Sequence, residues 1–135
     1  MTQEEIFAKT IFGEARGESL AGQEAVANVI LNRVKYAQHH PHIWWGKTIQ
    51  EVCLKPKQFS CWNKDDKNYR LLLENLNDNP LYQICLRVAK RAQAGLLPDN
   101  THHATHYHAV NCSPVWARHL VPCAEIGRHL FYVLP

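Results

Sequence analysis

The chain has 135 residues, of which 46% are hydrophobic and 20% charged, a composition that is ordinary for a soluble globular protein and excludes a disordered one. Its length predicts one domain, residues 1–135, with a single hydrophobic core. Fifteen Lys and Arg against twelve Asp and Glu leave a formal charge of +3 with no run of five or more like charges. We therefore expect no nucleic-acid partner, whereas an anionic polymer would suit this charge.

Three segments have the apolar spacing of amphipathic helices. They cover residues 3–12, 21–36 and 80–94. Gly13 is predicted to end the first helix, and Gly95 to end the third. The sequence therefore predicts a body of helices over its first two thirds.

A shorter helix and a change of period follow from local signals. Thr48 and Glu51 match a capping box, so a short helix should begin there and end before Pro56. From residue 105 onward apolar and polar residues alternate, and β-favouring residues return at 130–133. We expect short strands and loops in the C-terminal third.

The start of the chain and its cysteines bear on where the protein works. Residues 1–5 are acidic and lack the basic start of a signal peptide, so we expect synthesis in the cytoplasm without a classical signal. No apolar run approaches the ~20 residues that cross a bilayer, and we expect no membrane insertion. The five cysteines include no C-x-x-C pair, which predicts mostly buried free thiols. One or two disulfides are the alternative for a protein that works outside the cytoplasm.

Two carboxylates, Glu14 and Glu18, lie four residues apart between the first two predicted helices. A carboxyl group at a helix C-terminus faces the negative end of the dipole, and apolar neighbours such as Phe12 exclude water. Both effects favour the protonated form, which can donate a proton. The alternative is structural: the two carboxylates cap the next helix or pair with Arg16 and Arg33. Spacing alone leaves both interpretations open.

A histidine cluster and a set of aromatic residues are the other candidates for a site. His102, His106 and His108 could face one zinc ion, but no zinc-binding motif accompanies them, so we expect no metal cofactor. The alternative is a polar strand on which His106 and His108 share one face and Tyr107 points the other way. Sugars stack on aromatic rings, although at least half of these rings should be core. The rings are Trp44, Trp45, Phe59, Trp62, Tyr107, Trp116, Phe131 and Tyr132.

Six segments spread along nearly the whole chain match one known family. They read IFGEARGE (11–18), GQEAVANVILNRV (22–34), QFSCWN (58–63), ATHYHA (104–109), PVW (114–116) and IGRHLFY (126–132). With these segments the chain resembles the SleB-like cell wall hydrolase family, which includes spore-cortex-lytic enzymes and phage endolysins. The resemblance implies a mainly α (α+β) fold, a lysozyme-like helical domain with a small β-strand region in its C-terminal third.

The same resemblance implies an enzyme of peptidoglycan, a lytic transglycosylase that cleaves the bond between N-acetylmuramic acid and N-acetylglucosamine. Glu14 would be its catalytic residue, protonating the glycosidic oxygen before the 6-hydroxyl of the muramic acid attacks and gives its proton to the ionised Glu14. The implied partners are glycan strands, bound by a monomer. The implied substrate-binding residues are Glu18, Gln58, Phe59, Ser60, His106, Tyr107, His108 and Trp116.

Three alternatives to this function stay open at the level of sequence. The same Glu14 could support muramidase-type hydrolysis, with Glu18 as the nearby second carboxylate. A zinc-dependent peptidoglycan amidase could use His102, His106 and His108. The aromatic residues could also belong to a wall-binding module without catalysis. Without a classical export signal, we expect a phage endolysin that a separate holin releases to the wall, or else a bacterial wall hydrolase.

Overall fold

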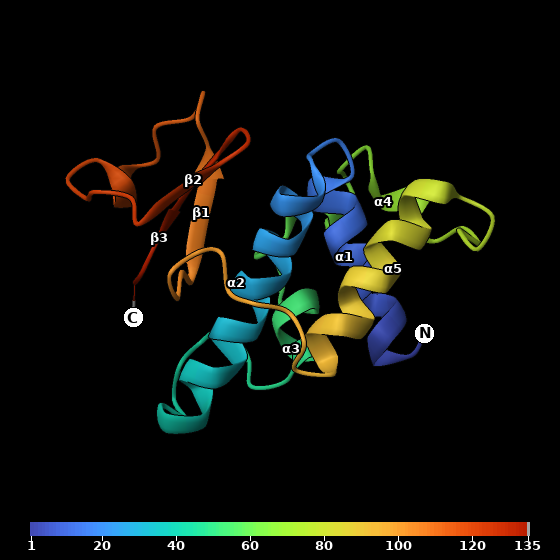
Figure 1. The fold of residues 1–135 in the computed structure, drawn as a ribbon, viewed down its shortest axis with the longest axis horizontal. Helices are drawn as coiled ribbons and strands as arrows, with labels where there is room; N and C mark the ends of the chain where they lie inside the picture. The colour runs from blue at the N-terminus through green and yellow to red at the C-terminus, as the bar shows by residue number, and fades with distance from the viewer. Residues whose placement is uncertain (135) are drawn as a thin grey trace.

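A computed structural model describes residues 1–134 of the chain. The elements follow one another as α1 (Gln3–Ala15), α2 (Leu20–His39), α3 (Ile49–Leu54), the 3-10 helix η1 (Ser60–Trp62), α4 (Tyr69–Leu72), α5 (Pro80–Gln93), β1 (His106–Ala109), the 3-10 helix η2 (Val115–Ala117), β2 (Ala124–Ile126) and β3 (His129–Tyr132). Helix α2 lies between the other long helices and the small sheet (Figure 1). None of the helices in the described part of the chain is both long and apolar enough to span a bilayer.

The three longer predicted helices are confirmed as α1, α2 and α5, with one correction to the first. Helix α1 does not end at Gly13 but continues through it to Ala15. The glycine serves close packing, because a Cβ atom built at Gly13 would lie 2.6 Å from Cβ of Cys61. Glu14 is therefore held in the last turn of α1, on a rigid element.

Short sequence motifs determine where α3 begins and where α5 ends. The Thr48 side chain accepts the backbone N–H of Glu51, and α3 ends at Leu54, as the sequence predicts. The capping box is only half formed there, since Glu51 Oε1 accepts from the backbone N–H of Lys47 instead. Gly95 follows α5 with a positive φ of 74°, a conformation that favours glycine and stops the helix.

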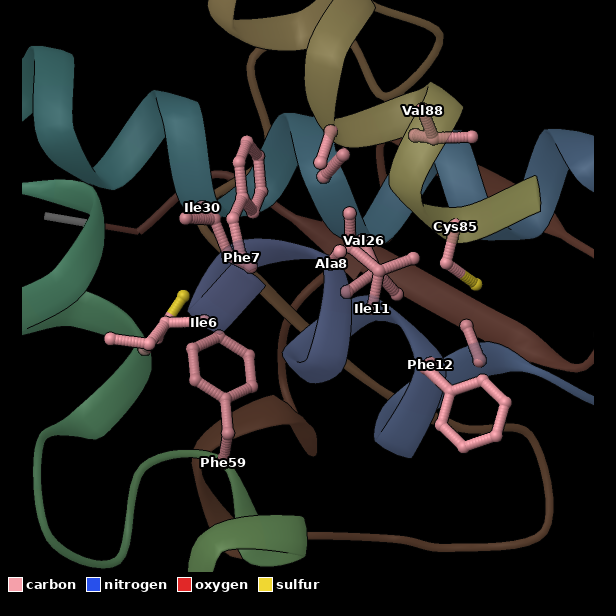
Figure 2. Packing of buried hydrophobic residues seen from close by; sticks show 14 of the residues in the cluster. Ile6, Phe7, Ala8, Ile11, Phe12, Val26, Ile30, Phe59, Cys85 and Val88 are labelled. Atoms are coloured by element: carbon pink, nitrogen blue, oxygen red, sulfur yellow. The ribbon is translucent and has the colours of Figure 1, made fainter. Parts of the chain in front are cut away.

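The main hydrophobic core is built around α1. Phe7, Ile11 and Phe12 of α1 are at most 1% exposed, and they pack against Val26 of α2 and Val88 of α5 (Figure 2). Full burial of one such side chain contributes about 1.5–3 kcal/mol. Because α1 is packed from several sides, the position of its last turn is fixed by the core.

The C-terminal strands form an antiparallel sheet in the order β1-β3-β2. Tyr107 pairs with Phe131 and Ala109 pairs with His129, and directly paired residues share one face of a sheet. Phe131 packs with Ala25 of α2, so this face is the inner one, turned toward the helices. Tyr107 and His129 therefore point to the helical body, and His106 and His108 to the opposite face, as the alternation predicts.

All five cysteines are free thiols. Cys53, Cys61 and Cys85 are buried, Cys123 is half-buried and Cys112 is exposed, which agrees with the expectation of mostly buried thiols. Burial raises the pKa of Cys53 and of Cys85 to about 12. These two thiols stay protonated at neutral pH and act as small apolar core residues.

Candidate active site

The carboxyl group of Glu14 is held by donors from two distant parts of the chain. The Tyr107 hydroxyl donates to Oε1 over 2.8 Å. The backbone N–H of Cys61, in η1, donates to Oε2 over 3.3 Å. The side chain is only half-buried, so it keeps contact with solvent while its orientation is fixed. This combination is what a positioned proton donor requires.

A cleft of about 400 Å³ opens beside Glu14, between the end of α1 and the hairpin of β2 and β3. The turn after α1 supplies one wall, and the segment after β1 and the start of β3 supply the other. Its lining residues are Glu14, Ala15, Gly17, Glu18, Ala109, Val110, Asn111, Arg128 and His129. The cleft thus presents two carboxylates, a guanidinium and an imidazole to one ligand-sized space.

Tyr107 is kept as a hydrogen-bond donor by its surroundings. Burial is the main effect that raises the pKa of Tyr107 well above its ordinary value, and the nearby Glu14 adds to it. The buried guanidinium of Arg33 acts in the opposite direction. The phenol therefore stays neutral over the physiological range and always offers a proton to the Glu14 carboxyl group.

Arg33 stabilises the start of β1, the strand that carries Tyr107. Its Nε donates to the Thr105 carbonyl over 2.7 Å, and its guanidinium carbon lies 5.3 Å from the centre of the Trp45 ring and 5.6 Å from that of Phe59. Burial lowers the pKa of Arg33 to about 10, so the group still carries its charge at neutral pH. It fixes the backbone that leads into β1.

Glu18 holds the hairpin turn of the sheet against the helices. Its Oε1 accepts the backbone N–H of Arg128 over 3.0 Å, and its Oε2 accepts Nε and Nη2 of Arg128 over 3.0 and 2.9 Å. A Cβ atom at Gly127, where φ is 57°, would lie 2.6 Å from Oε1 of Glu18. The glycine thus permits both the turn and the close approach of the carboxylate.

The sequence also allowed a purely structural interpretation, in which Glu14 and Glu18 cap the next helix or pair with Arg16 and Arg33. The structure does not show these partners. Arg16 donates to Asn68 and Arg33 to Thr105, while Ser19 caps α2. Glu18 is an ion-pair residue as that alternative required, but its cation is Arg128, which lies 110 positions away. Within residues 1–134 Glu14 has no part in such a pair, and it lines the cleft.

Glu18 makes the stability of the hairpin depend on pH. The backbone N–H of Arg128, together with its guanidinium, lowers the pKa of Glu18 below its ordinary value of 4.5. A lowered pKa adds stability above the unfolded-state value and loses it as pH falls through the folded-state value. We expect Glu18→Gln to reduce the free energy of unfolding by about 1–3 kcal/mol at neutral pH. Urea titrations should show this difference shrinking below pH 4.5, and a constant difference across pH would contradict it.

The other sequence-predicted binding residues fall into two groups outside the lining of the cleft. Gln58 donates to the carbonyls of Val52 and Trp45 over 2.7 and 3.3 Å, and Phe59 is 3% exposed, so both side chains face the interior and not the cleft. Ser60 is exposed at the start of η1, next to the donor that binds Glu14.

His106, His108 and Trp116 gather with Tyr132 on the face of the sheet opposite Tyr107, where the His106 ring also lies 5.8 Å from the buried Trp45 ring. The Trp116 ring lies 5.5 Å from His106, 5.6 Å from His108 and 5.2 Å from Tyr132. Trp116 is 40% exposed, so this cluster is an aromatic surface on the far side of β1 from Tyr107. Burial lowers the pKa of His106 to about 4, which keeps its imidazole neutral.

The three histidines proposed as zinc ligands are not brought together. Within residues 1–134 no three His, Cys, Asp or Glu side chains are placed to hold a metal ion. Both ring nitrogens of His108 are engaged in hydrogen bonds, Nδ1 with the Ala109 carbonyl and Nε2 with the Tyr132 hydroxyl. His102 is exposed on the preceding loop. It has a positive φ of 56°, the backbone conformation for which a glycine would be favoured.

The sequence did not single out Arg128, His129 or Asn111 as parts of the site. Arg128 and His129 belong to the segment IGRHLFY, but no spacing rule connects that segment with residues 14 and 18. The one available signal was the glycine before Arg128, which marks a turn in the strand pattern.

The helical body, the small sheet and the acidic cleft between them define a lysozyme-like, mainly α domain. The chain belongs to the Cell Wall Hydrolase family, whose sequence profile matches residues 17–132. The matched region begins after Glu14, so the role of that residue rests on the geometry of the cleft.

Known relatives agree with this family. The spore cortex-lytic enzyme of Bacillus cereus is 28% identical over 132 residues, which is 94% of this chain. The chain spans 42% of that relative's length. The solved catalytic domain of the germination-specific lytic transglycosylase SleB from Bacillus anthracis matches with a TM-score of 0.68 and 26% identity, covering 96% of this chain and 92% of that one. The catalytic domain of Bacillus cereus SleB matches equally well, with 88% of its chain covered.

Proposed function

We propose that the chain is a peptidoglycan lytic transglycosylase that cleaves the bond between N-acetylmuramic acid and N-acetylglucosamine with Glu14 as general acid/base. The observation that carries the proposal is the carboxyl group of Glu14, oriented by Tyr107 and by the Cys61 backbone at the edge of a cleft. A solved relative of similar fold is itself named as a lytic transglycosylase.

The hydrogen bonds indicate which oxygen of Glu14 carries the proton. Oε1 accepts the short bond from Tyr107, whereas Oε2 accepts only the longer bond from Cys61. In the protonated acid Oε2 is therefore the oxygen that is free to give its proton to the glycosidic oxygen. As the bond from C1 to that oxygen breaks, positive charge develops on the sugar, and the Glu14 carboxylate that remains stabilises it.

The cleft favours attack by a group of the substrate over hydrolysis with a second carboxylate. A conventional glycosidase needs a second carboxyl group ~5–9.5 Å from the acid, acting as nucleophile or base. Glu18 is the other carboxylate in the cleft, and three hydrogen bonds to Arg128 engage both of its oxygens. The muramic acid's own 6-hydroxyl can close on C1 instead, giving a 1,6-anhydro end, and the Glu14 carboxylate regains its proton from the one that this hydroxyl loses.

The products test this proposal directly. Purified peptidoglycan digested by the protein should release muropeptides with 1,6-anhydro ends, which are lighter by one water than the reducing-end products of a muramidase. Mass spectrometry separates the two. Reducing ends alone would convert the proposal into muramidase-type hydrolysis, and free stem peptides with intact glycan would identify an amidase. Release of neither would favour a wall-binding module.

The biological setting is a second part of the proposal. We propose a lytic protein that acts on the bacterial wall, as phage endolysins and spore-cortex enzymes do. A phage origin with release by a holin stays a prediction from the sequence. Expression in the cytoplasm with and without a membrane-permeabilising protein tests it: lysis should require both proteins.

A further inference from the structure

His129 is an unassigned imidazole in the same cleft as Glu14. It begins β3 and lies on the inner face of the sheet, with its ring centre 5.0 Å from that of Tyr107. Its side chain is 13% exposed. Tyr107 in turn bonds Glu14, so the imidazole stands next to the side chain that orients the proposed acid.

The two ring nitrogens of His129 have different surroundings. Nδ1 is buried without a hydrogen-bond partner, at 3.8 Å from Oε1 of Glu18. Nε2 is not buried in this way, and His129 lines the cleft, so Nε2 is the ring nitrogen left to face it. A proton on Nδ1 is attracted by the Glu18 carboxylate, whereas a lone pair there would be repelled. The favoured tautomer therefore turns an accepting lone pair on Nε2 toward the cleft.

We propose that His129 is a second catalytic residue, whose Nε2 binds the attacking 6-hydroxyl of the muramic acid and relays its proton to the Glu14 carboxylate, with Glu18 as its positioning residue. The inference rests on the proposed function. Glu14 gives its proton to the leaving oxygen while the bond from C1 to that oxygen breaks. The 6-oxygen then bonds to C1, and its proton passes to Nε2. Once the product has left, solvent carries that proton from the imidazolium to the Glu14 carboxylate.

The surroundings of His129 keep its imidazole ready to accept a proton. Burial lowers the pKa of His129 below its ordinary value of 6.5, with smaller contributions in the same direction from Arg128 and His108. Glu18 and Glu14 oppose this by favouring the imidazolium. The group is therefore neutral at neutral pH and gains a proton only as pH falls.

His129→Gln tests the base, because the amide keeps polar atoms near Nε2 but cannot take a proton. On soluble glycan strands we expect kcat to fall at least about 100-fold, with KM changed by less than about threefold. The decline of activity at low pH, which protonation of His129 causes, should disappear from the profile of the variant. His119→Gln, at an exposed site outside the cleft, is the matched control and should behave as wild type.

Three further measurements keep the proposal testable if His129→Gln unfolds. Added imidazole should restore turnover to His129→Ala, and ¹⁵N spectra of the wild type should show the proton on Nδ1. Glu18→Gln should move the low-pH decline to lower pH, because the carboxylate that raises the pKa of His129 is gone. If Glu18 had a purely structural role, the decline of activity at low pH would occur at the same pH in Glu18→Gln as in the wild type.

Opposite results would overturn the assignment of His129. One such result is a His129→Gln enzyme that keeps the wild-type kcat and the same decline of activity at low pH. The other is a ¹⁵N spectrum of the wild type that places the imidazole proton on Nε2. Either would mean that the Glu14 carboxylate takes the proton of the 6-hydroxyl directly, without His129. Failure of the proposed function is a different result, because the wild type itself would then release no 1,6-anhydro ends.

Discussion

Glu14→Gln is expected to lower glycan cleavage by at least about 1000-fold while leaving the fold intact. The amide has the size of the acid but no proton that it can give to a glycosidic oxygen. Its carbonyl oxygen can still accept the Tyr107 hydroxyl, whose bond to Oε1 is the shorter of the two. Only the 3.3 Å bond from the Cys61 N–H is at risk, which costs at most about 1 kcal/mol.

The measurement pairs release of 1,6-anhydro muropeptides with urea unfolding of the same preparation. Glu125→Gln, on the exposed position of β2, is the matched control and should keep wild-type activity. Glu18→Gln should retain more activity than Glu14→Gln, because Glu18 holds the hairpin and orients a neighbour without reaching the scissile bond in this scheme.

Two outcomes would contradict the role of Glu14. Loss of activity in Glu18→Gln but not in Glu14→Gln would exchange the two carboxylates. Unchanged wall binding and no activity in either wild type or variant would identify a binding module, for which Glu14 has no chemical task.

The parts of this structure that local rules control could be predicted from the sequence. The long helices follow from apolar spacing, the start of α3 from Thr48, and the opposite faces of His106 and Tyr107 from strand alternation. Glu14 could be named as a candidate because it belongs to a continuous motif near the end of a helix, and its catalytic role came from the family resemblance. In each case the deciding interactions lie within a few residues.

The rest of the site depends on how the sheet docks against α2 and α1. The ion pair of Glu18 with Arg128 joins positions 110 residues apart, and the bond from Tyr107 to Glu14 joins positions 93 apart. No periodicity links such residues, so His129 could not be placed beside Glu18. The outer position of Trp116 likewise follows from the loop after β1, whose path has no sequence signature.

Gly13 was predicted to end the first helix, but the reason for a glycine at this position is a contact with a distant segment. As a helix-ending glycine it would need a left-handed conformation, but it lies within α1, where helices usually disfavour glycine by about 1 kcal/mol relative to alanine. The reason for the glycine is η1: a Cβ atom would meet Cβ and Sγ of Cys61 at 2.6 and 2.8 Å. The absence of a side chain lets the Cys61 N–H reach Glu14.

Gly13→Ala is therefore expected to destabilise the protein by about 1–3 kcal/mol despite the better helix propensity of alanine. It should also reduce cleavage, since α1 and η1 must separate and the donor to Oε2 of Glu14 moves with η1. Urea unfolding and muropeptide release measure the two effects. Gly17→Ala is the matched control for stability in the same motif, because the atom nearest to its Cβ lies at 3.7 Å, an ordinary contact.

A double-mutant cycle identifies the clash as the cause. Cys61→Gly removes the Cβ atom that Gly13→Ala would meet, so the double variant should lose clearly less stability than the sum of the two single variants. Additive losses would mean that η1 already yields to an alanine at position 13. In that case the close approach of α1 and η1 would not be what holds the Cys61 N–H against the carboxyl group of Glu14.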